Sequence, residues 1–459
     1  MERTNINFIE QQAGLPTRLT QIPTLLQLHE TLQSLATEVT SAGPSGPPCL
    51  RLFIVEDLSR GVIEALGSRF DIDALFFREQ TEDYIWHNTR DPWVKTPDLH
   101  ATMKRRKWFR VRNARLRYHK SERSFQDSRL EAAAFNVLRR PDDDANHWRY
   151  QDAKGSVVST TRTKTTIWVG EDRMCANTTV GIVLLDPTTK HGYPLWYDRA
   201  NWIPLTDMFT SQARPSPSSE SWFADITQST LSYPWFQPSA AGAAIDVRRI
   251  VLPAIYTVCA EWLVVCEYVK ARLGQVEWMM EMPALFIARG PEVDRALKKL
   301  NVWRRQVPAW REMVAETLHQ TIPAAKRLTL DPNRAHDDDD AFGDVTADFE
   351  RVLDMLDRLQ ARIDRLSDRG NAEMQLEAAR QSLAESHDLA RLTWLATIFV
   401  PLTFMSGLFS MTDDVGSITG TFRVYFAAAV PVAFISLVIA RWGSVVFRGV
   451  ARLLFKKAE

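Results

Sequence analysis

The chain has 459 residues, enough for two or three domains with well-formed cores. Its 56 Lys and Arg residues balance 56 Asp and Glu residues, so net charge gives no reason to expect a nucleic acid or an acidic substrate. The four cysteines show neither C-x-x-C pairs nor metal-ligand spacing, and we interpret them as reduced thiols of a large cytosolic portion. The N-terminus lacks the basic and apolar regions of a signal peptide, so no cleaved signal is expected.

The first half of the chain is predicted to mix strands and helices. Residues 1–40 are expected to be loosely helical, and residues 41–48, rich in Gly and Pro, to form a linker. β-rich or alternating patterns predict strands at 50–55, 108–118, 165–169 and 179–185, and a helix is predicted at 58–66. We therefore predict an α/β or α+β cytosolic domain over residues 1–240.

The segment 104–120 holds nine Lys or Arg residues among aromatic side chains. Such a segment superficially resembles a nucleic-acid surface. In a protein of zero net charge, we interpret it as one solvated basic face of a strand, and we expect no nucleic-acid partner.

Residues 241–390 are predicted to be helical and to end in a long stalk helix. The apolar run 250–265 contains Glu261 and is bracketed by charges, which favours a buried soluble helix over a membrane span. The apolar residues of that helix recur at helical spacing: Val251, Ile255, Val258, Trp262, Val265 and Val269.

An acidic linker is predicted at 331–344, and its four consecutive carboxylates are Asp337, Asp338, Asp339 and Asp340. A solvated linker is the simpler interpretation. Clustered carboxylates also suit a hard cation, so a weak regulatory divalent-cation site is the alternative.

A heptad pattern follows the acidic linker. Its apolar positions are Phe349, Val352, Leu356, Leu359, Ile363 and Leu366. Steps of three and four residues indicate a helix–helix seam, which one chain would leave unpaired and which we expect to seal a ring of subunits. We predict one helix from about residue 345 into the membrane, with Gly370 as the weakest point.

The last segment, 391–459, is predicted to cross the bilayer twice. Residues 392–411 carry no charge over about 30 Å of helix, and residues 424–440 form a second, shorter span. The loop between them carries Asp413 and Asp414, and a basic tail follows the second span. The positive-inside rule therefore predicts a multi-pass protein of the lipid bilayer with both termini cytosolic. The plasma membrane is favoured, and an organelle membrane is the alternative.

Two transmembrane helices cannot enclose a pore, so the chain either anchors a cytosolic domain or assembles around a common axis. One stripe of the first span, with an average step of 3.5 residues, is a candidate axial face. Its members are Leu389, Leu392, Ala396, Val400, Thr403, Gly407 and, at its end, Ser410. A packing face of small residues would give a similar pattern, so both interpretations stay open.

Residues 397–412, TIFVPLTFMSGLFSMT, resemble the first transmembrane helix of the CorA family of magnesium channels. That family has a similar Ile-Phe-x-Pro-Leu-Thr-Phe stretch, which leads to an aromatic residue and then Gly-Met-Asn. The order of parts is also similar: an α/β domain, a long helix, an acidic loop, a second span and a basic tail. Residues 52–57 and 90–93 are similar to the fungal CorA-like branch.

The resemblance implies a funnel-shaped homopentamer with one first-span helix per subunit around the pore. The positions that match Gly-Met-Asn are Ser410, Met411 and Thr412, a degenerate form of the selectivity motif. Thr412 keeps a hydroxyl that can face the water shell of a hydrated Mg²⁺, an ion that loses its water reluctantly. Repeated around the axis, Asp413 and Asp414 would concentrate cations at the outer mouth.

We therefore predict a channel or transporter for divalent cations, with Mg²⁺ favoured. One alternative is a Zn²⁺ transporter of the ZntB type. Another is a non-conducting membrane-anchored sensor or scaffold, which the changes at Ser410 and Thr412 favour. We expect no enzyme, because the chain has no nucleophile-elbow, Walker A, dinucleotide-binding or zincin motif. No covalently bound cofactor is expected; Mg²⁺ or another divalent cation is the transported ion and a candidate regulator.

Overall fold

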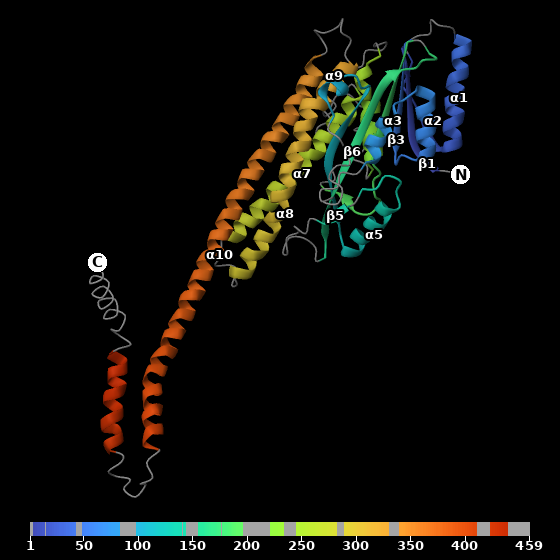
Figure 1. Ribbon diagram of the computed structural model, residues 1–459. Coiled ribbons are helices and arrows are strands. Elements are labelled where there is room, and N and C mark those ends of the chain that lie inside the picture. Colours follow the sequence, from blue (N-terminus) through green and yellow to red (C-terminus); the bar gives the residue numbers. More distant parts are fainter. Residues whose placement is uncertain are drawn as a thin grey trace, which may run out of the picture. The chain divides into compact units, whose positions relative to one another are not determined.

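The computed structural model describes residues 3–13, 15–42, 48–82, 98–139, 141–143, 155–175, 177–195, 221–233, 245–281, 289–329, 339–410 and 423–438. The chain divides into two compact units, Met1–Gly370 and Asn371–Glu459. Each unit is described by itself below. The first unit is an α/β domain with long helices, as the sequence predicts (Figure 1).

An eight-stranded sheet forms the centre of the first unit. Its strands are β1 (Arg3–Gln12), β2 (Arg18–Thr24), β3 (Cys49–Glu56), β4 (Trp108–His119), β5 (Pro141–Asp143), β6 (Val157–Glu171), β7 (Thr178–Leu185) and β8 (Tyr193–Pro194). The spatial order is β2-β1-β3-β7-β6-β4-β8, and β5 pairs with β6. β3 and β7 run parallel, whereas every other described pair is antiparallel.

Helices cover both faces of this sheet. They are α1 (Leu25–Ala42), α2 (Arg60–Phe70), α3 (Ala74–Thr81), α4 (His100–Met103), α5 (Glu122–Ala133), α6 (Trp222–Ser232), η2 (Val247–Ile250), α7 (Leu252–Glu281), α8 (Arg289–Glu316), η4 (Thr317–Thr321), α9 (Ile322–Thr329) and α10 (Asp339–Phe409). Side-chain oxygens of Ser59, Asp73 and Ser121 accept hydrogen bonds from backbone amides and so cap the starts of α2, α3 and α5.

Strand β3 shows why the sheet needs two cores. Leu52 and Ile54 point into the core formed with α6, α7, α8 and α10, whereas Phe53 and Val55 point into the core formed with α1, α2 and α3. Successive side chains of a strand alternate between faces, so a central strand covered on both sides is mostly apolar. Arg51 is the exception in β3, and its buried guanidinium pairs with Glu10 and Asp172. The continuous run 50–55 predicts this strand correctly.

The N-terminus differs from the prediction. Residues 1–40 were expected to be helical, but β1 and β2 precede α1 and pair with each other. β1 also pairs with β3, and its Ile6, Phe8 and Ile9 are buried. The helical interpretation was wrong because polar residues between these apolar ones hide a strand that has partners on both edges.

The basic face of the strand at 108–118 also differs from the prediction. β4 is confirmed, but its arginines are not solvated: Arg115 and Arg117 are each 5% exposed. The Arg115 guanidinium donates to the Thr188 hydroxyl and lies over the Trp222 ring, 4.6 Å from its centroid. Arg117 donates to the carbonyl of Gly192 at 2.7 Å. Buried arginines require such partners, and these come from loops distant in the sequence.

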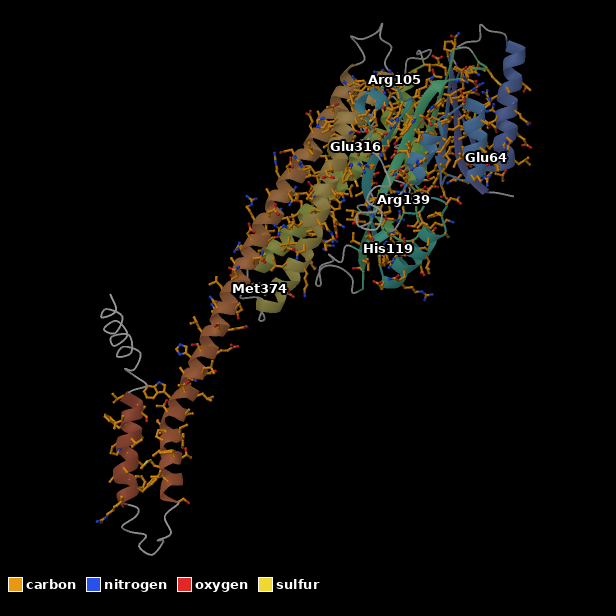
Figure 2. The ribbon with its side chains drawn as sticks, in the orientation of Figure 1. Glu64, Arg105, His119, Arg139, Glu316 and Met374 are labelled. Carbon is orange, nitrogen blue, oxygen red and sulfur yellow. The ribbon has the colours of Figure 1, made fainter. Side chains whose placement is uncertain are left out.

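A buried polar network connects α3 to the sheet. The guanidinium of Arg139, which is labelled in Figure 2, donates to Asp186 at 2.6 Å, and the Gln80 amide donates to the same carboxylate at 2.5 Å. The backbone amide of Lys164 in β6 also donates to Asp186, at 2.7 Å. With both carboxylate oxygens bonded, Asp186 can stay buried at the end of β7.

Helix α7 is the apolar helix that the sequence predicts to be soluble. Its most apolar 18-residue stretch is hydrophobic enough to cross a membrane, but 78% of that stretch is buried inside the first unit. Its predicted stripe is buried throughout, with Ile255, Val258, Trp262, Val265 and Val269 all fully inaccessible. The prediction of a buried core helix is confirmed.

The heptad of α10 is buried within a single subunit. All six heptad residues are buried, and they form one apolar cluster with side chains of α7 and α8, including Trp262, Trp303 and Trp310. Arg304 of α8 also pairs with Asp364 of α10 at 3.4 Å. The predicted helix–helix seam therefore exists, but the expectation that it joins neighbouring subunits was wrong, because the subunit's own helices fill it.

Gly370 does not break α10, which is continuous from Asp339 to Phe409. A Cβ atom at this position would lie 2.6 Å from Leu297 Cδ2 and 3.2 Å from Met280 Cε. The missing side chain thus lets the ends of α7 and α8 approach α10 closely. The predicted single long helix is confirmed.

The second unit contains the remainder of α10 and a helix over Arg423–Val438. α10 holds an 18-residue window with a mean hydropathy of 1.4, and none of that window is buried. The Tyr425 hydroxyl donates to the Leu402 carbonyl at 3.3 Å, and Ala429 is fully buried. The predicted spans 392–411 and 424–440 thus coincide with helices as far as described residues reach; 411–422 and 439–459 lie outside them.

We predict that Leu356→Ala destabilises the isolated subunit. The side chain is completely buried between α10, α7 and α8, so its truncation should lower the free energy of unfolding by about 2–5 kcal/mol. The shift is measurable as a lower urea midpoint of tryptophan fluorescence in detergent, since Trp262, Trp303 and Trp310 report on this cluster. Leu130→Ala, at a 72% exposed position, is the matched control and should change stability by less than about 0.5 kcal/mol. Equal effects of the two substitutions would contradict the intrachain seam.

Candidate functional site

The candidate axial face lies on the part of α10 that belongs to the second unit. Leu389, Leu392 and Val400 are 66%, 67% and 64% exposed. Ala396, Thr403 and Gly407 are exposed as well, and an added Cβ on Gly407 would meet nothing within 4 Å. The structure therefore places these six predicted pore residues on the uncovered surface of this helix.

The opposite side of the same helix contacts the helix Arg423–Val438. Ile398, Leu402 and Met405 are partly covered, and Leu402 accepts the hydrogen bond of Tyr425. At about 100° of rotation per residue, this covered stripe lies roughly opposite the stripe of Val400 and Thr403. The second helix thus covers the back of α10 and leaves the candidate axial face open.

Threonine hydroxyls along this helix donate to the helix's own backbone. Thr393 donates to the Leu389 carbonyl at 2.8 Å, Thr397 donates to the Thr393 carbonyl at 2.7 Å, and Thr403 donates to the Val400 carbonyl at 3.1 Å. Each hydroxyl hydrogen is thereby used, while the oxygen keeps lone pairs that can accept from water. Thr403, on the open face, presents such an oxygen.

The selectivity motif falls at the end of the described helix. Ser410 forms a turn after α10, and its amide donates to the Ser406 carbonyl at 3.0 Å. Met411 and Thr412 lie outside the described residues, as do Asp413 and Asp414 of the loop. Asp337 and Asp338 also lie outside them, whereas Asp339 and Asp340 begin α10. Among the described side chains, no three His, Cys, Asp or Glu residues group to hold a metal.

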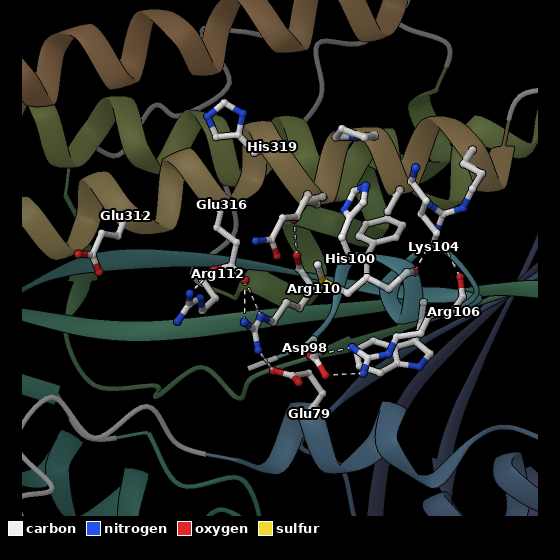
Figure 3. Close-up of a pocket in the computed structure, with 18 residues that line it drawn as sticks. Glu79, Asp98, His100, Lys104, Arg106, Arg110, Arg112, Glu312, Glu316 and His319 are labelled. Atoms are coloured by element: carbon white, nitrogen blue, oxygen red, sulfur yellow. Dashed lines mark hydrogen bonds and ion pairs between the residues drawn. The ribbon is translucent and has the colours of Figure 1, made fainter. Parts of the chain in front are cut away.

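Sequence reasoning missed a cavity of about 650 Å³ in the first unit. The strand β4 forms its floor, and α3, α4 and the run α8–η4–α9 form its walls (Figure 3). Its charged lining residues are Glu79, Asp98, Lys104, Arg106, Arg110, Arg112, Glu312, Glu316 and Arg327. The signal in the sequence was the alternating arginines of 104–120 together with carboxylates on a distant helix.

Three arginines of this cavity are held by carboxylates. Arg110 bonds Glu316 at 2.7 Å and also bonds Glu79, while Arg112 bonds the other oxygen of Glu316. Burial opposes the charge of Glu316, but Arg112 and Arg110 outweigh it and hold its pKa below the usual value. Arg106 binds Asp98 through two parallel hydrogen bonds of 2.9 and 2.7 Å. These pairs fix the floor of the cavity in an ionised, rigid state.

A comparison with known protein families finds a match to the helical, C-terminal part of the chain. Residues 293–448 match the family model described as CorA-like Mg²⁺ transporter protein. The matched region contains the segment 397–412 that carries the resemblance seen in the sequence. Among curated proteins, none matches this chain.

Two solved structures are similar over nearly the whole chain. The CorA magnesium transporter from Methanocaldococcus jannaschii is 10% identical, over 95% of this chain and 97% of that chain, with a TM-score of 0.43. The full-length CmaX protein is 11% identical, over 96% of this chain and 98% of that chain, with a TM-score of 0.41. The family match over residues 293–448 covers α10 and the helix Arg423–Val438, and the exposed apolar stretch of α10 within it supports a membrane protein.

Proposed function

We propose that this chain is one subunit of a channel or transporter for divalent cations, with Mg²⁺ as the favoured ion. Ions would pass along the axis of a homo-oligomer, a pentamer by the family resemblance, lined by the C-terminal part of α10. The family match over 293–448 supports this proposal, because it covers both helices of the second unit.

The observation that carries the proposal is the placement of the open face. Leu389, Val400 and Thr403 lie on one uncovered stripe, opposite the side that Tyr425 and its helix cover. The open stripe differs from the exposed side chains beside it in composition, since Phe399 and Phe404 are bulky whereas Thr403 and Gly407 are small. Small and hydroxyl-bearing residues at Thr403 and Gly407 leave room near an axis, and leucines further along can close it by excluding water.

An assembly is required by this proposal, since two helices per chain cannot enclose a pore. The heptad does not supply the contact between subunits, because α7 and α8 already cover it. Beyond Gly370 the described side chains of α10 are exposed or only partly covered in the single chain, including Met374, Leu376 and Leu383. This stretch is therefore the surface that we assign to contacts between copies, whereas the axial face lines the ion path.

A non-conducting sensor or scaffold is the second candidate. The residues at Ser410 and Thr412 favour it, because serine and threonine replace the glycine and asparagine of the family motif. A Zn²⁺ transporter of the ZntB type is the alternative within transport. The experiments below test whether the protein conducts divalent ions and, if it does, which ion it prefers.

The topology is the first test. With both termini cytosolic, a cysteine at Gly416 and a cysteine at Lys457 should react with impermeant reagents from opposite sides of the membrane. Cys49, Cys259 and Cys266 are buried, so only Cys175 needs prior replacement by serine to suppress background labelling. Labelling of both new positions from one side would refute the hairpin.

The axial face is the second test. We expect Leu392→Ser to raise Mg²⁺ uptake into proteoliposomes several-fold, because a polar ring is easier to wet than a leucine ring. Leu395→Ser is the matched control: it makes the same change on the same helix, at a 55% exposed position off the axial stripe. Its uptake should equal that of the parent. Similar uptake by both variants, at equal assembly mass in nanodiscs, would count against the assigned pore face.

The outer mouth is the third test. Ser410→Gly plus Thr412→Asn restores the Gly-Met-Asn motif, and an amide oxygen that accepts from the hydrated ion is worth about 0.5–1.5 kcal/mol. We expect roughly two- to tenfold tighter Mg²⁺ binding and greater selectivity against monovalent ions, measured by flux with Mg²⁺, Co²⁺, Ni²⁺ and Zn²⁺.

A second pair of substitutions tests the predicted acidic loop: Asp413→Asn plus Asp414→Asn should lower uptake most at low ionic strength. If neither the parent nor the restored motif moves any divalent ion, although both assemble, the sensor or scaffold replaces the channel.

A further inference from the structure

The cavity on β4 is large enough for a small molecule and is separate from the membrane helices. Its volume of about 650 Å³ falls within the usual range of ligand pockets, about 300–1,000 Å³. All its lining residues belong to the first unit. The proposed ion pathway makes no use of them.

The lining of this cavity carries five cationic side chains and four carboxylates, the fourth carboxylate being Glu312. Glu79, Asp98 and Glu316 are already paired with Arg110, Arg106 and Arg112. Within the described part of the chain, Lys104 has no ion-pair partner, and the Arg327 guanidinium contacts only the carbonyls of Met103 and Arg106, at 3.5 and 3.4 Å. Lys104 and Arg327 therefore face the cavity without a paired carboxylate, and they lie at the same end of it, because Arg327 contacts the carbonyls of residues on either side of Lys104. Figure 3 shows Glu312 at the end opposite Lys104.

Apolar side chains line the cavity near these two cations. Met103, Phe109, Pro323 and Ala324 supply this part of the wall. Such a surface gains little from a bare inorganic ion, but it can bury the carbon skeleton of an organic molecule. The combination of an apolar wall with convergent charged groups at one end is typical of sites for small organic ligands.

The helix in the wall has an irregular turn at this place. η4, Thr317–Thr321, is a π-helical turn between α8 and α9. Pro323 explains it: proline has no amide hydrogen for the carbonyl four residues earlier, and its ring would clash with that carbonyl. The Thr321 hydroxyl anchors the turn to β4 by donating to the Arg110 carbonyl at 2.7 Å. Turns of this kind occur frequently at functional sites.

We propose that this cavity binds a small organic anion. Its phosphate or carboxylate group lies against Lys104 and Arg327, and its organic part packs on Met103, Pro323 and Ala324. Arg110 and Arg112 do not bind the ligand directly, because Glu79 and Glu316 occupy them; they hold the floor in place. The proposal is independent of the ion that the membrane helices carry.

Calorimetry on the full-length protein in nanodiscs tests it with four probes: AMP, citrate, adenosine and inorganic phosphate. We expect AMP or citrate to bind at one molecule per chain, and comparison of the two identifies the phosphate or the carboxylate as the preferred group. Adenosine lacks the charge and inorganic phosphate lacks the organic part, so both should bind at least about tenfold more weakly than the better anion.

Matched variants locate the site. Lys104→Ala plus Arg327→Ala should weaken binding at least about tenfold. Arg105→Ala plus Lys107→Ala removes the same charge from adjacent residues outside the cavity lining (Arg105 is labelled in Figure 2) and should leave affinity within about twofold. Ala324→Glu places a carboxylate against the bound anion and should abolish binding, whereas Ala324→Ser should not. The proposal is overturned if neither AMP nor citrate binds the parent at millimolar concentration, or if the two double variants lose affinity equally.

Discussion

The burial of one apolar face of α10 against α7 and α8 is the interaction on which the rest of the structure depends. A buried leucine or isoleucine contributes about 1.5–3 kcal/mol, and the heptad from Phe349 to Leu366 supplies a continuous row of such residues. This row fixes the first part of α10 in the sheet-containing unit. Because the helix continues unbroken past Gly370, the element that packs on the core of the first unit also carries the candidate axial face.

Local patterns predicted those features that depend on local sequence. The uncharged run 392–411, the strand pattern at 50–55 and the apolar stripe of α7 each indicate their own environment, because burial on one side or on all sides determines the period of apolar residues. A pattern does not state which partner covers it. The heptad correctly indicated a seam, yet only the structure shows that Trp262 and Trp303 of the same chain fill it. β1 was missed for a related reason: its pairing with β3 depends on residues 37 to 51 positions away.

The two candidate sites differ in the same respect: one could be predicted from local sequence and the other could not. The stripe of Leu389 to Gly407 and the motif at Ser410 lie within one helix and its end, so the sequence alone brings them together. The cavity on β4 joins Glu79, Lys104, Arg110, Glu316 and Arg327, which come from separate elements. Arg110 and Arg112 looked like a solvated basic face because Glu316, more than 200 positions later, is the carboxylate that neutralises them. A zero net charge does not reveal where charges are paired and where they are not.

The distribution of charge also constrains how an ion could be recognised along α10. Between Leu392 and Phe409 the helix has no charged side chain, so a cation near Thr403 would meet only hydroxyl and backbone oxygens. The hydrogen of the Thr403 hydroxyl is already donated to the Val400 carbonyl, which leaves its oxygen as an acceptor. Neutral acceptors cannot replace the hydration shell of Mg²⁺, but they can accept hydrogen bonds from its water. Recognition on this surface would therefore act on the hydrated ion, and the attraction that concentrates cations would come from carboxylates elsewhere in the chain, such as Asp413 and Asp414 of the predicted loop.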